Sequence, residues 1–448
     1  LGATDLRARA AAHRTELAEL GLDMALRAGR PRQVFEWAER NRATGMLLHR
    51  PIRPPDEPGA ADVLAELRGV VMRIAELRVA GHEAPGLAAL ARRQEGLERR
   101  IRDQSRRDLR ADGAMPPSPV GVAQLAARLG DAALVEFVVR SDTLLALTVA
   151  AGRVRLRDLG PMSRAVDLIH RISFAMSRLS HTAVAGPARA AAAGLLRAAA
   201  AETDRLLVRA IPELDGRALV VVPTGELQDM PWGVLPSCAL RPVTVAPSAT
   251  QWYLASGKEA LPGHTVVAAG PTLPGAYHEV ALIAKLHGVE PLVGAAASVE
   301  AVLAKMDGAG LVHIAAHGRL DAHNPLFSSV LLADGPLFAH DVERLPRAPR
   351  TVVLASCDGG RSVVCAGDEL LGLSAALLAA GSARLVAPVV PLPDLATVST
   401  MDAFHAAMAD GKCAAEALAA ARERMRGTEP AEVAIAGFVC FGAGLALA

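Results

Sequence analysis

The chain has 448 residues, of which 51% are hydrophobic and only 3% aromatic, and its 48 basic and 47 acidic side chains leave a formal net charge of +1. This composition excludes a disordered chain, which is poor in apolar residues and strongly charged. It also argues against a dedicated nucleic-acid binder, which carries a basic excess and stacking aromatics. Five cysteines without a repeated spacing exclude a disulfide scaffold and favour reduced thiols, and the length predicts about two to four domains.

The ends of the sequence carry no predicted membrane segment. The chain begins with Leu1 rather than Met and has no apolar signal core, and we expect it to be part of a longer chain. The longest uncharged stretch, residues 433–448, is shorter than the roughly 18 apolar residues of a membrane span and contains three glycines. We therefore expect a cytoplasmic protein without a membrane partner. The heavy use of Ala, Gly and Arg is typical of a bacterial gene of high GC content.

Residues 1–50 predict a pair of helices. Apolar residues recur at helical spacing over about 17–28, a Gly-Arg-Pro break follows at residues 29–31, and a second amphipathic stretch covers about 32–48. Two short helices separated by Gly and Pro resemble the last repeat of a tetratricopeptide array. A single pair cannot bury both of its faces, so we expect either further repeats before it or packing against the residues that follow.

Residues 51–115 predict an Arg-rich helical hairpin between Pro-rich linkers. The linkers are residues 51–60 and 111–120, and the helices cover about 61–80 and 84–110. We interpret the arginines as a solvated helix face that carries ion pairs at i,i+4 spacing. Nucleic-acid binding by this basic stretch is the alternative, and it would give salt-dependent retention on DNA or RNA.

Strands and helices alternate from residue 116 onward. A hairpin is predicted over 133–139 and 143–150, and a helical region covers about 162–210. Further strands are predicted at about 218–223, 265–270, 311–316, 351–356, 383–388 and, last, 432–440. Further helices are predicted at about 276–287, 298–306, 368–380, 394–409 and 413–426. The alternation predicts an α/β fold with a mostly parallel sheet flanked by helices, in two halves, 116–260 and 261–448.

His317 and Cys357 each follow an apolar strand directly. Residues 311–316 lead to His317 and Gly318, and residues 351–356 lead to Cys357, 40 positions after the histidine. Ligands bind at the carboxyl ends of strands in open parallel sheets, so we expect both side chains at one edge. There a thiolate would be the nucleophile and the imidazole its base, in the order found in caspase-type peptidases. The backbone N–H groups of Gly318 and Cys357 would bind the oxyanion of the tetrahedral intermediate.

Longer segments surround these two residues. They read VHIAAHGRLDAHNPLFSSVLLADG, TVVLASCDGG and GDELLGLSAALLAAGSARLVAPVVPLPDLAT, and upstream stand LVVVPTGELQDMPWGVL, VAPSATQWYLAS and AYHEVALIAKL. Over about residues 130–448 the chain resembles the CHAT family, caspase-like domains commonly found beside tetratricopeptide repeats. The resemblance implies a clan CD cysteine endopeptidase fold, with His317 and Cys357 as the dyad and Gly318 in the oxyanion hole.

Two departures from the family pattern lie next to the dyad. Residues 355–360 read Ala-Ser-Cys-Asp-Gly-Gly where the family usually has S-A-C-x-T-G, and residues 388–390 are Pro-Val-Val where it usually has S-L-W. Neither change removes the dyad, and both would alter the shape of the substrate pocket. The specificity of the family is therefore not transferred to this chain.

Three acidic residues lie close to the predicted nucleophile. They are Asp358, Asp368 and Glu369, and one or two of them would line the pocket for the residue before the scissile bond and select Arg or Lys there. Alternatively, Asp368 and Glu369 cap the helix predicted to begin at residue 368, because acidic side chains favour the first turn of a helix. We favour the cap for these two, and peptide libraries without a preference for Arg or Lys would end the pocket hypothesis.

The remaining candidates for chemistry are interpreted as structural. His313 lies four residues before His317, about 13 Å away along a strand, so one metal ion cannot bind both, and we expect a buried or hydrogen-bonded His313. Cys365 is interpreted as a loop or pocket thiol rather than a redox partner of Cys357. The other three cysteines are interpreted as small core residues: Cys238, Cys413 and Cys440. No glycine-rich nucleotide motif is present, and we expect no cofactor and no metal.

The sequence therefore predicts a cysteine endopeptidase that cleaves a protein substrate. Cys357 would attack the peptide carbonyl, His317 would transfer the protons, and the helical N-terminal region would bind a regulatory protein or the substrate protein. The alternative is a catalytically silent caspase-like scaffold or sensor that binds protein partners through helical repeats. Labelling of Cys357 by an active-site-directed electrophile discriminates between the two.

Overall fold

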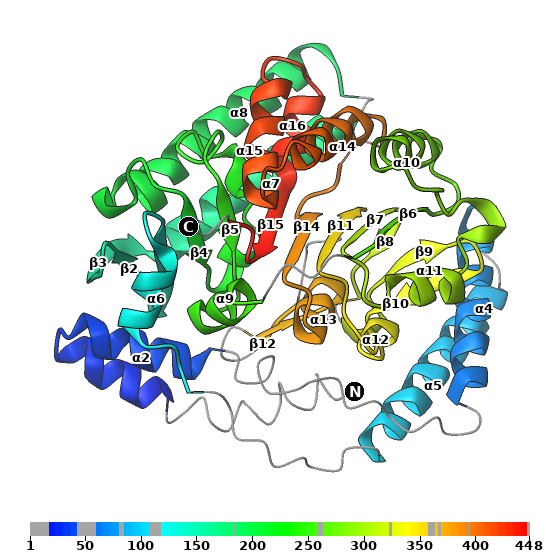
Figure 1. Cartoon of the computed structure of the whole chain (residues 1–448), viewed down its shortest axis with the longest axis horizontal. Coiled ribbons are helices and arrows are strands. Elements are labelled where there is room, and N and C mark those ends of the chain that lie inside the picture. The colour runs from blue at the N-terminus through cyan, green and yellow to red at the C-terminus, as the bar shows by residue number, and fades with distance from the viewer. Residues whose placement is uncertain are drawn as a thin grey trace.

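In the part of the chain that the structure describes, ten strands form one continuous sheet with helices on both faces (Figure 1). The structure is a computed structural model. It describes residues 18–42, 60–79, 85–107, 118–181, 184–258, 263–321, 325–356, 363–365, 369–392 and 394–445. The predicted fold class, a mostly parallel sheet flanked by helices and preceded by a helical region, is confirmed.

The first five strands form one side of the sheet. β1 (Ala133–Arg140), β2 (Thr143–Ala150) and β3 (Arg153–Pro161) are antiparallel neighbours, and β4 (Leu219–Val222) and β5 (Val243–Val245) continue from β1 in parallel. The predicted hairpin and the strand near 218–223 are confirmed. β3 and β5 are not predicted from the sequence, because β3 is an arginine-rich edge strand and β5 has only three residues.

The other five strands form the side that carries the predicted dyad. β6 (Thr265–Ala269), β7 (Leu311–Ala315), β11 (Thr351–Ala355) and β14 (Arg384–Pro388) are parallel, as expected, and β15 (Phe438–Gly442) runs antiparallel to β14. The full order is β3-β2-β1-β4-β5-β15-β14-β11-β7-β6. β15 joins the two sides, and the proposed division of the chain at residue 260 stays a prediction.

The strand predicted over 432–440 is wrong in its first part. Ala431–Gly437 form the helix α16, and the strand begins only at Phe438. Ala431, Ala434 and Ile435 are buried at i, i+3 and i+4, so the burial follows the period of a helix rather than that of a strand.

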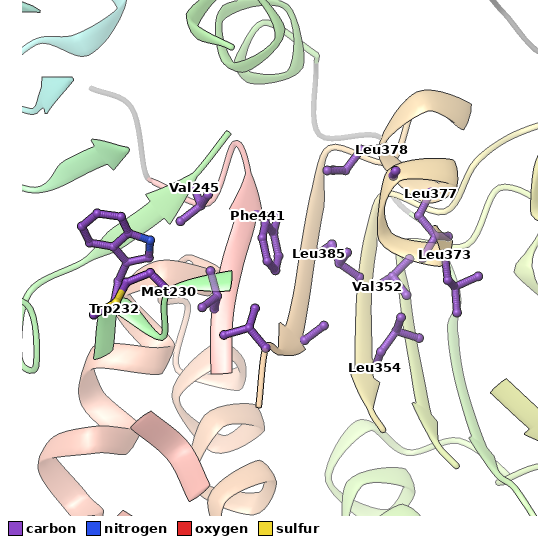
Figure 2. Packing of buried hydrophobic residues seen from close by; sticks show 14 of the residues in the cluster. Met230, Trp232, Val245, Val352, Leu354, Leu373, Leu377, Leu378, Leu385 and Phe441 are labelled. Carbon is purple, nitrogen blue, oxygen red and sulfur yellow. The ribbon is translucent and has the colours of Figure 1, made fainter. Parts of the chain in front are cut away.

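Alternate residues of the strands pack against helices on opposite faces of the sheet. One face is covered by α7 (Met162–Ser180), α8 (Gly186–Asp204), α11 (Val299–Met306), α12 (Ala339–Val342) and α13 (Leu373–Ala380). The other is covered by α2 (Pro31–Asn41), α6 (Val122–Leu129), α9 (Ala249–Ser256), α10 (Pro274–His287), α14 (Asp394–Ala409) and α15 (Ala414–Met425). Figure 2 shows Val352, Leu354 and Leu385 on the face that α13 covers. Within the described residues, none of the helices has the length and apolar character of a membrane span.

The N-terminal helices form two separate units at opposite ends of the molecule (Figure 1). Residues 18–27 are helical and are followed by α2, so the predicted pair is present, and it packs on the sheet domain. The predicted second helix was extended to residue 48; α2 ends at Asn41, and residues 43–50 lie outside the described residues. α4 (Ala60–Val79) and α5 (Pro85–Arg107) form the predicted hairpin, in which Arg93 donates to Glu66.

Candidate active site

β7 and β11 are neighbouring parallel strands whose ends coincide. Ala315, the last residue of β7, lies opposite Ala355, the last residue of β11, and the N–H of Ala316 donates to the Ala355 carbonyl at 3.3 Å. His317 therefore leaves the sheet at the edge that β11 also reaches. Cys357, two residues beyond Ala355 in the sequence, lies outside the described residues.

A small three-stranded sheet holds the segment that begins at His317. β8 (Gly318–Arg319), β9 (Ser329–Leu332) and β10 (Gly335–Phe338) are antiparallel neighbours. The His317 side chain is exposed, while its carbonyl accepts a hydrogen bond from the Leu331 N–H at 2.8 Å. Gly318 is half-buried and pairs with Val330. The imidazole is thus open to solvent on a backbone that is fixed by β9, whereas the oxyanion role of Gly318 stays a prediction.

A chain of buried hydrogen bonds lies beneath this edge. His313 of β7 is fully buried and bonds to Glu279 of α10, with Nε2 2.9 Å from Oε1. His405 of α14 approaches His313 with its Nε2 3.1 Å from Nδ1, and His287 at the end of α10 approaches His405 in the same way, also at 3.1 Å. The expectation of a buried, hydrogen-bonded His313 is confirmed. Its partners are missed by sequence reasoning, although a lone acid among the apolar residues of α10 is a signal for one of them.

The histidine chain has one consistent set of proton positions. If each neutral imidazole carries its proton on Nε2, His287 donates to His405, His405 donates to His313, and His313 donates to Glu279. Burial lowers the pKa of His405 well below its ordinary value, with the neighbouring histidines adding to the effect, and burial also lowers the pKa of His287. Neutral imidazoles are therefore favoured at His287 and His405, and the hydrogen bonds of the histidine chain tie β7 to α10 and α14.

The acidic residues predicted for the substrate pocket are placed only in part. Asp358 and Asp368 lie outside the described residues. The backbone of Glu369 belongs to a strand, β13 (Glu369–Leu371), which pairs with β12 (Val363–Cys365) so that Cys365 lies opposite Glu369. The backbone of Cys365 therefore lies in a strand and not in a loop, so this part of its interpretation is wrong, and its role as a pocket thiol stays a prediction.

The helix predicted to begin at residue 368 begins instead at Leu373. The residue before it, Gly372, has a φ of 138°, a conformation that favours glycine and separates the strand from the helix. The interpretation of Glu369 as a cap of this helix is wrong, because its backbone is paired in β13. Its role in a substrate pocket stays a prediction.

Two of the cysteines predicted to be core residues are buried thiols. Cys238 and Cys440 are free and buried, and burial raises the pKa of each thiol to about 12. Cys413 forms no disulfide in the described part of the chain and is only half-buried. Because thiolates are the reactive form, Cys238 and Cys440 are poor nucleophiles at neutral pH.

Comparisons with known proteins address the family and the fold. The family model of the CHAT domain matches residues 189–443, which is more than half of the chain. A solved structure of the Saccharomyces cerevisiae separase–securin complex at 3.0 Å resolution is similar with a TM-score of 0.53 and 8% identity, covering 70% of this chain and 30% of that chain. A second, at 2.6 Å resolution, has a TM-score of 0.52 and 9% identity, covering 72% of this chain and 30% of that chain. No curated protein matches.

The two kinds of similarity support different conclusions, one about the fold and one about the family. At such low identity the likeness to separase shows a shared fold, and this chain spans less than a third of the length of those proteins. The CHAT match contains β6, β7, β11, β14 and β15, the five strands on the side of the sheet where His317 lies. It begins later than the resemblance inferred from the sequence, which starts near residue 130. The resemblance itself is confirmed, and the chain belongs to the CHAT family.

Proposed function

We propose that this chain is a cysteine endopeptidase in which Cys357 and His317 form the catalytic dyad. The register of β7 and β11 carries the proposal, since these neighbouring strands end side by side and each is followed two residues later by one member of the dyad. Ligands of parallel α/β sheets bind at this edge. Membership in the CHAT family, whose caspase-like fold is shared with separase, supports the same assignment.

The dyad would cleave a peptide bond in two steps. Cys357 Sγ attacks the carbonyl carbon while His317 accepts the thiol proton, and the tetrahedral oxyanion is bound by the N–H groups of Gly318 and Cys357. The C–N bond then breaks, His317 gives the proton to the leaving amine, and a thioester remains on Cys357. A water molecule, deprotonated by His317, attacks the thioester and releases the new carboxylate and the free thiol.

Selection of a basic residue before the scissile bond is part of the proposal. The hairpin of β12 and β13 follows Cys357 within a few residues, and it begins its second strand at Glu369. Together with Asp358 and Asp368, this carboxylate would attract Arg or Lys. Peptide libraries that show no preference for these residues would remove this part alone.

Regulation is proposed to act through the helical N-terminal region. The α4–α5 hairpin packs on the small sheet that starts next to His317: Arg68 of α4 pairs with Asp341 at 2.7 Å and donates to the carbonyl of Pro336 in β10 at 3.3 Å. A regulatory protein that moved the hairpin would act on β10, β9 and β8, and so on the segment after His317. The free thiols of Cys238, Cys413 and Cys440 agree with a reducing, cytoplasmic location.

The proposal is tested by the reactivity of Cys357 and by cleavage. Trypsin cuts after Arg350 and Arg361, so Cys357 lies alone in its peptide and its alkylation by iodoacetamide is measured by mass spectrometry. We expect Cys357 to react at pH 7 about tenfold faster than a free thiol, because the imidazole favours the thiolate, and His317→Ala to remove this advantage. In a cell lysate, the native chain is expected to produce new protein N-termini that Cys357→Ala does not.

The matched control is Cys413→Ala, which removes a half-buried thiol outside the predicted dyad. It should leave both the alkylation of Cys357 and the cleavage products unchanged. Retained cleavage by Cys357→Ala would refute the endopeptidase assignment. Ordinary reactivity of Cys357 together with an absence of cleavage would favour the catalytically silent scaffold instead.

A further inference from the structure

The histidine chain crosses the packed interior from a half-exposed end to a buried one, and the proposed cleavage mechanism does not use it. His287, at the end of α10, is half-exposed, whereas His405 and His313 are 0% exposed. Glu279, at the inner end, is 1% exposed. Nδ1 of His287 has no hydrogen-bond partner in the described part of the chain and is not buried, so it is open to water. The chain therefore connects solvent to a carboxyl group between α10, β7 and α14, which pack together over one face of the sheet (Figure 1).

The four side chains do not converge on one point, as the ligands of a metal ion would. His405 faces His287 with Nδ1 and His313 with Nε2. His313 likewise uses both of its ring nitrogens, Nδ1 toward His405 and Nε2 toward Glu279. A nitrogen that faces a neighbouring ring is not free to face a shared ion, and among the described residues no three His, Cys, Asp or Glu side chains are arranged to hold a metal. The contacts are therefore hydrogen bonds in series.

Hydrogen bonds in series between neutral imidazoles all point in the same direction. Each neutral ring donates from one nitrogen and accepts at the other, so the proton position in one ring determines the position in the next. While the carboxylate of Glu279 is ionised it accepts from His313, and every ring then carries its proton on Nε2. The opposite direction requires a proton on Glu279 and places the ring protons on Nδ1. Both directions satisfy all three contacts, and the two states differ by one proton.

Burial favours an added proton at the inner end of the chain. The titratable groups that face one another here are Glu279 and His287 from α10, His313 from β7 and His405 from α14. Burial lowers the pKa of His405 well below 6.5, and the other two rings add to the effect, while burial also lowers the pKa of His287. A proton on His405 would create a buried charge, whereas a proton on the carboxylate of Glu279 removes one.

We propose that the histidine chain is a proton relay that ends in a buried proton-binding site at Glu279. A proton from water binds Nδ1 of His287, whose Nε2 proton moves to Nδ1 of His405. The Nε2 proton of His405 moves to Nδ1 of His313, and the Nε2 proton of His313 moves to Oε1 of Glu279. Each ring gains one proton and loses one, so the rings stay neutral while the carboxylate loses its charge. All three hydrogen bonds reverse and none is lost, so α10, β7 and α14 stay tied in both states.

The test follows the ring protons of the full chain, labelled with ¹⁵N-histidine, by NMR from about pH 8 to about pH 5. We expect His405 and His313 to change together from the Nε2–H to the Nδ1–H tautomer, at one apparent pKa, because the linked groups titrate as one unit. Neither ring should become an imidazolium. An imidazolium at His287 with unchanged tautomers at His405 and His313, or no change at any of the three rings, overturns the proposal. The measurement needs no substrate, so it does not depend on the peptidase assignment.

A variant separates the buried acceptor from the other titrating groups. Glu279→Gln keeps the size of the side chain but takes up no proton, so His405 and His313 should each keep one tautomer throughout the titration. His278→Gln, which changes an exposed histidine of α10 outside the chain, should leave the joint tautomer change intact. If Glu279→Gln does not fold, the native chain labelled with ¹³C-glutamate supplies the answer, because one carboxyl signal should titrate at the same pH as the rings. A tautomer change that persists in Glu279→Gln, or that no carboxyl signal accompanies, overturns the proposal.

Discussion

α2 and the α4–α5 hairpin join the same sheet domain in different ways. Two buried charged residues stand at the end of α2: Glu39 in its last turn and Arg42 directly after it, which are 4% and 3% exposed. Glu39 accepts hydrogen bonds from the N–H groups of Ala249 and Thr250 at the start of α9, at 2.9 and 2.7 Å, and Arg42 donates to Glu136 of β1 at 2.8 Å. These contacts reach the interior of the sheet domain.

The hairpin is attached much more lightly. It packs through a small apolar cluster of its own, which includes Phe327 and Phe338, and through the pair of Arg68 with Asp341, where Arg68 keeps 19% exposure. Detaching the hairpin would remove the partly exposed Arg68 from Asp341, which also accepts a hydrogen bond from the N–H of Phe338, whereas detaching α2 would break the pair of Arg42 and Glu136, in which both side chains are buried. The difference teaches that α2 is joined to the interior of the domain, while the hairpin is joined mainly at its surface, next to the segment that follows His317.

The largest expected effect comes from breaking the attachment of α2. Arg42→Met removes the cation that contacts Glu136 and the donor to the carbonyl of Pro223. Breaking a buried ion pair from one side costs about 3–5 kcal/mol of unfolding free energy, which urea unfolding measures. Arg68→Met should cost no more than about 1 kcal/mol, because its pair with Asp341 is partly exposed. Equal losses of unfolding free energy in Arg42→Met and Arg68→Met would contradict the proposed difference between the two attachments.

An intermediate effect on the unfolding free energy is expected from a change of pH. Its sign is opposite at His340, next to the hairpin contact, and at Glu39 of α2. Burial lowers the pKa of His340 below 6.5, with Arg344 and Arg68 adding to the effect and Asp341 opposing it. The folded state therefore binds a proton at His340 less readily than the unfolded state does. As a result, the unfolding free energy falls as the pH drops below 6.5. Burial raises the pKa of Glu39 above 4.5, so its contribution is full below pH 4.5 and is lost as the pH rises through the raised value.

Urea unfolding between pH 4 and pH 8 measures both slopes. His340→Gln should flatten the loss of unfolding free energy on the acid side, and Glu39→Gln should flatten the loss that develops as the pH rises above 4.5. Each loss amounts in total to about 1.4 kcal/mol of unfolding free energy for every unit by which the pKa differs between the folded and unfolded states. Slopes of the same sign at the two positions would be inconsistent with the opposite shifts.

The smallest expected effect on stability, and the most informative for the active site, comes from loosening the hairpin. Arg68→Ala removes the contacts with Asp341 and β10 and should slow the alkylation of Cys357 severalfold, because the segment after His317 loses support. Arg93→Ala is the control, since its pair with Glu66 lies within the hairpin. An unchanged alkylation rate in Arg68→Ala would show that the hairpin does not influence the proposed dyad.

Sequence patterns predict the strands around the candidate site because buried strands are short runs of apolar residues, which are visible in the sequence. β7 and β11 are short aliphatic runs that end at polar residues, so their ends, and the positions of His317 and Cys357 after them, follow from the sequence alone. The hydrogen bonds of the histidine chain cannot be predicted from the sequence in this way. Its bonds join His313 to residues 34 and 92 positions away, Glu279 and His405, and only the packing of α10 and α14 over β7 brings them together.

The segment after Cys357 shows a second limit of prediction from the sequence. Glu-Leu-Leu at residues 369–371 fits the first turn of a helix as well as a strand, and its local propensity favours the helix. Pairing with Val363–Cys365 decides for the strand, because a cross-strand partner outweighs local preference. The boundaries of α10, α11, α14 and α15 are predicted within about two residues, whereas the short helices α6 and α9 are not predicted from the sequence.

β15 comes after all the other strands of the sheet in the sequence, yet in space it lies between β5 and β14. A ribosome therefore makes His317 and Cys357 well before it makes the strand that unites the two sides. In a nascent chain, β5 and β14 are edge strands that lack the neighbour they share until the ribosome releases Phe438–Gly442. The order of synthesis thus delays completion of the sheet until after both residues of the proposed dyad have been made.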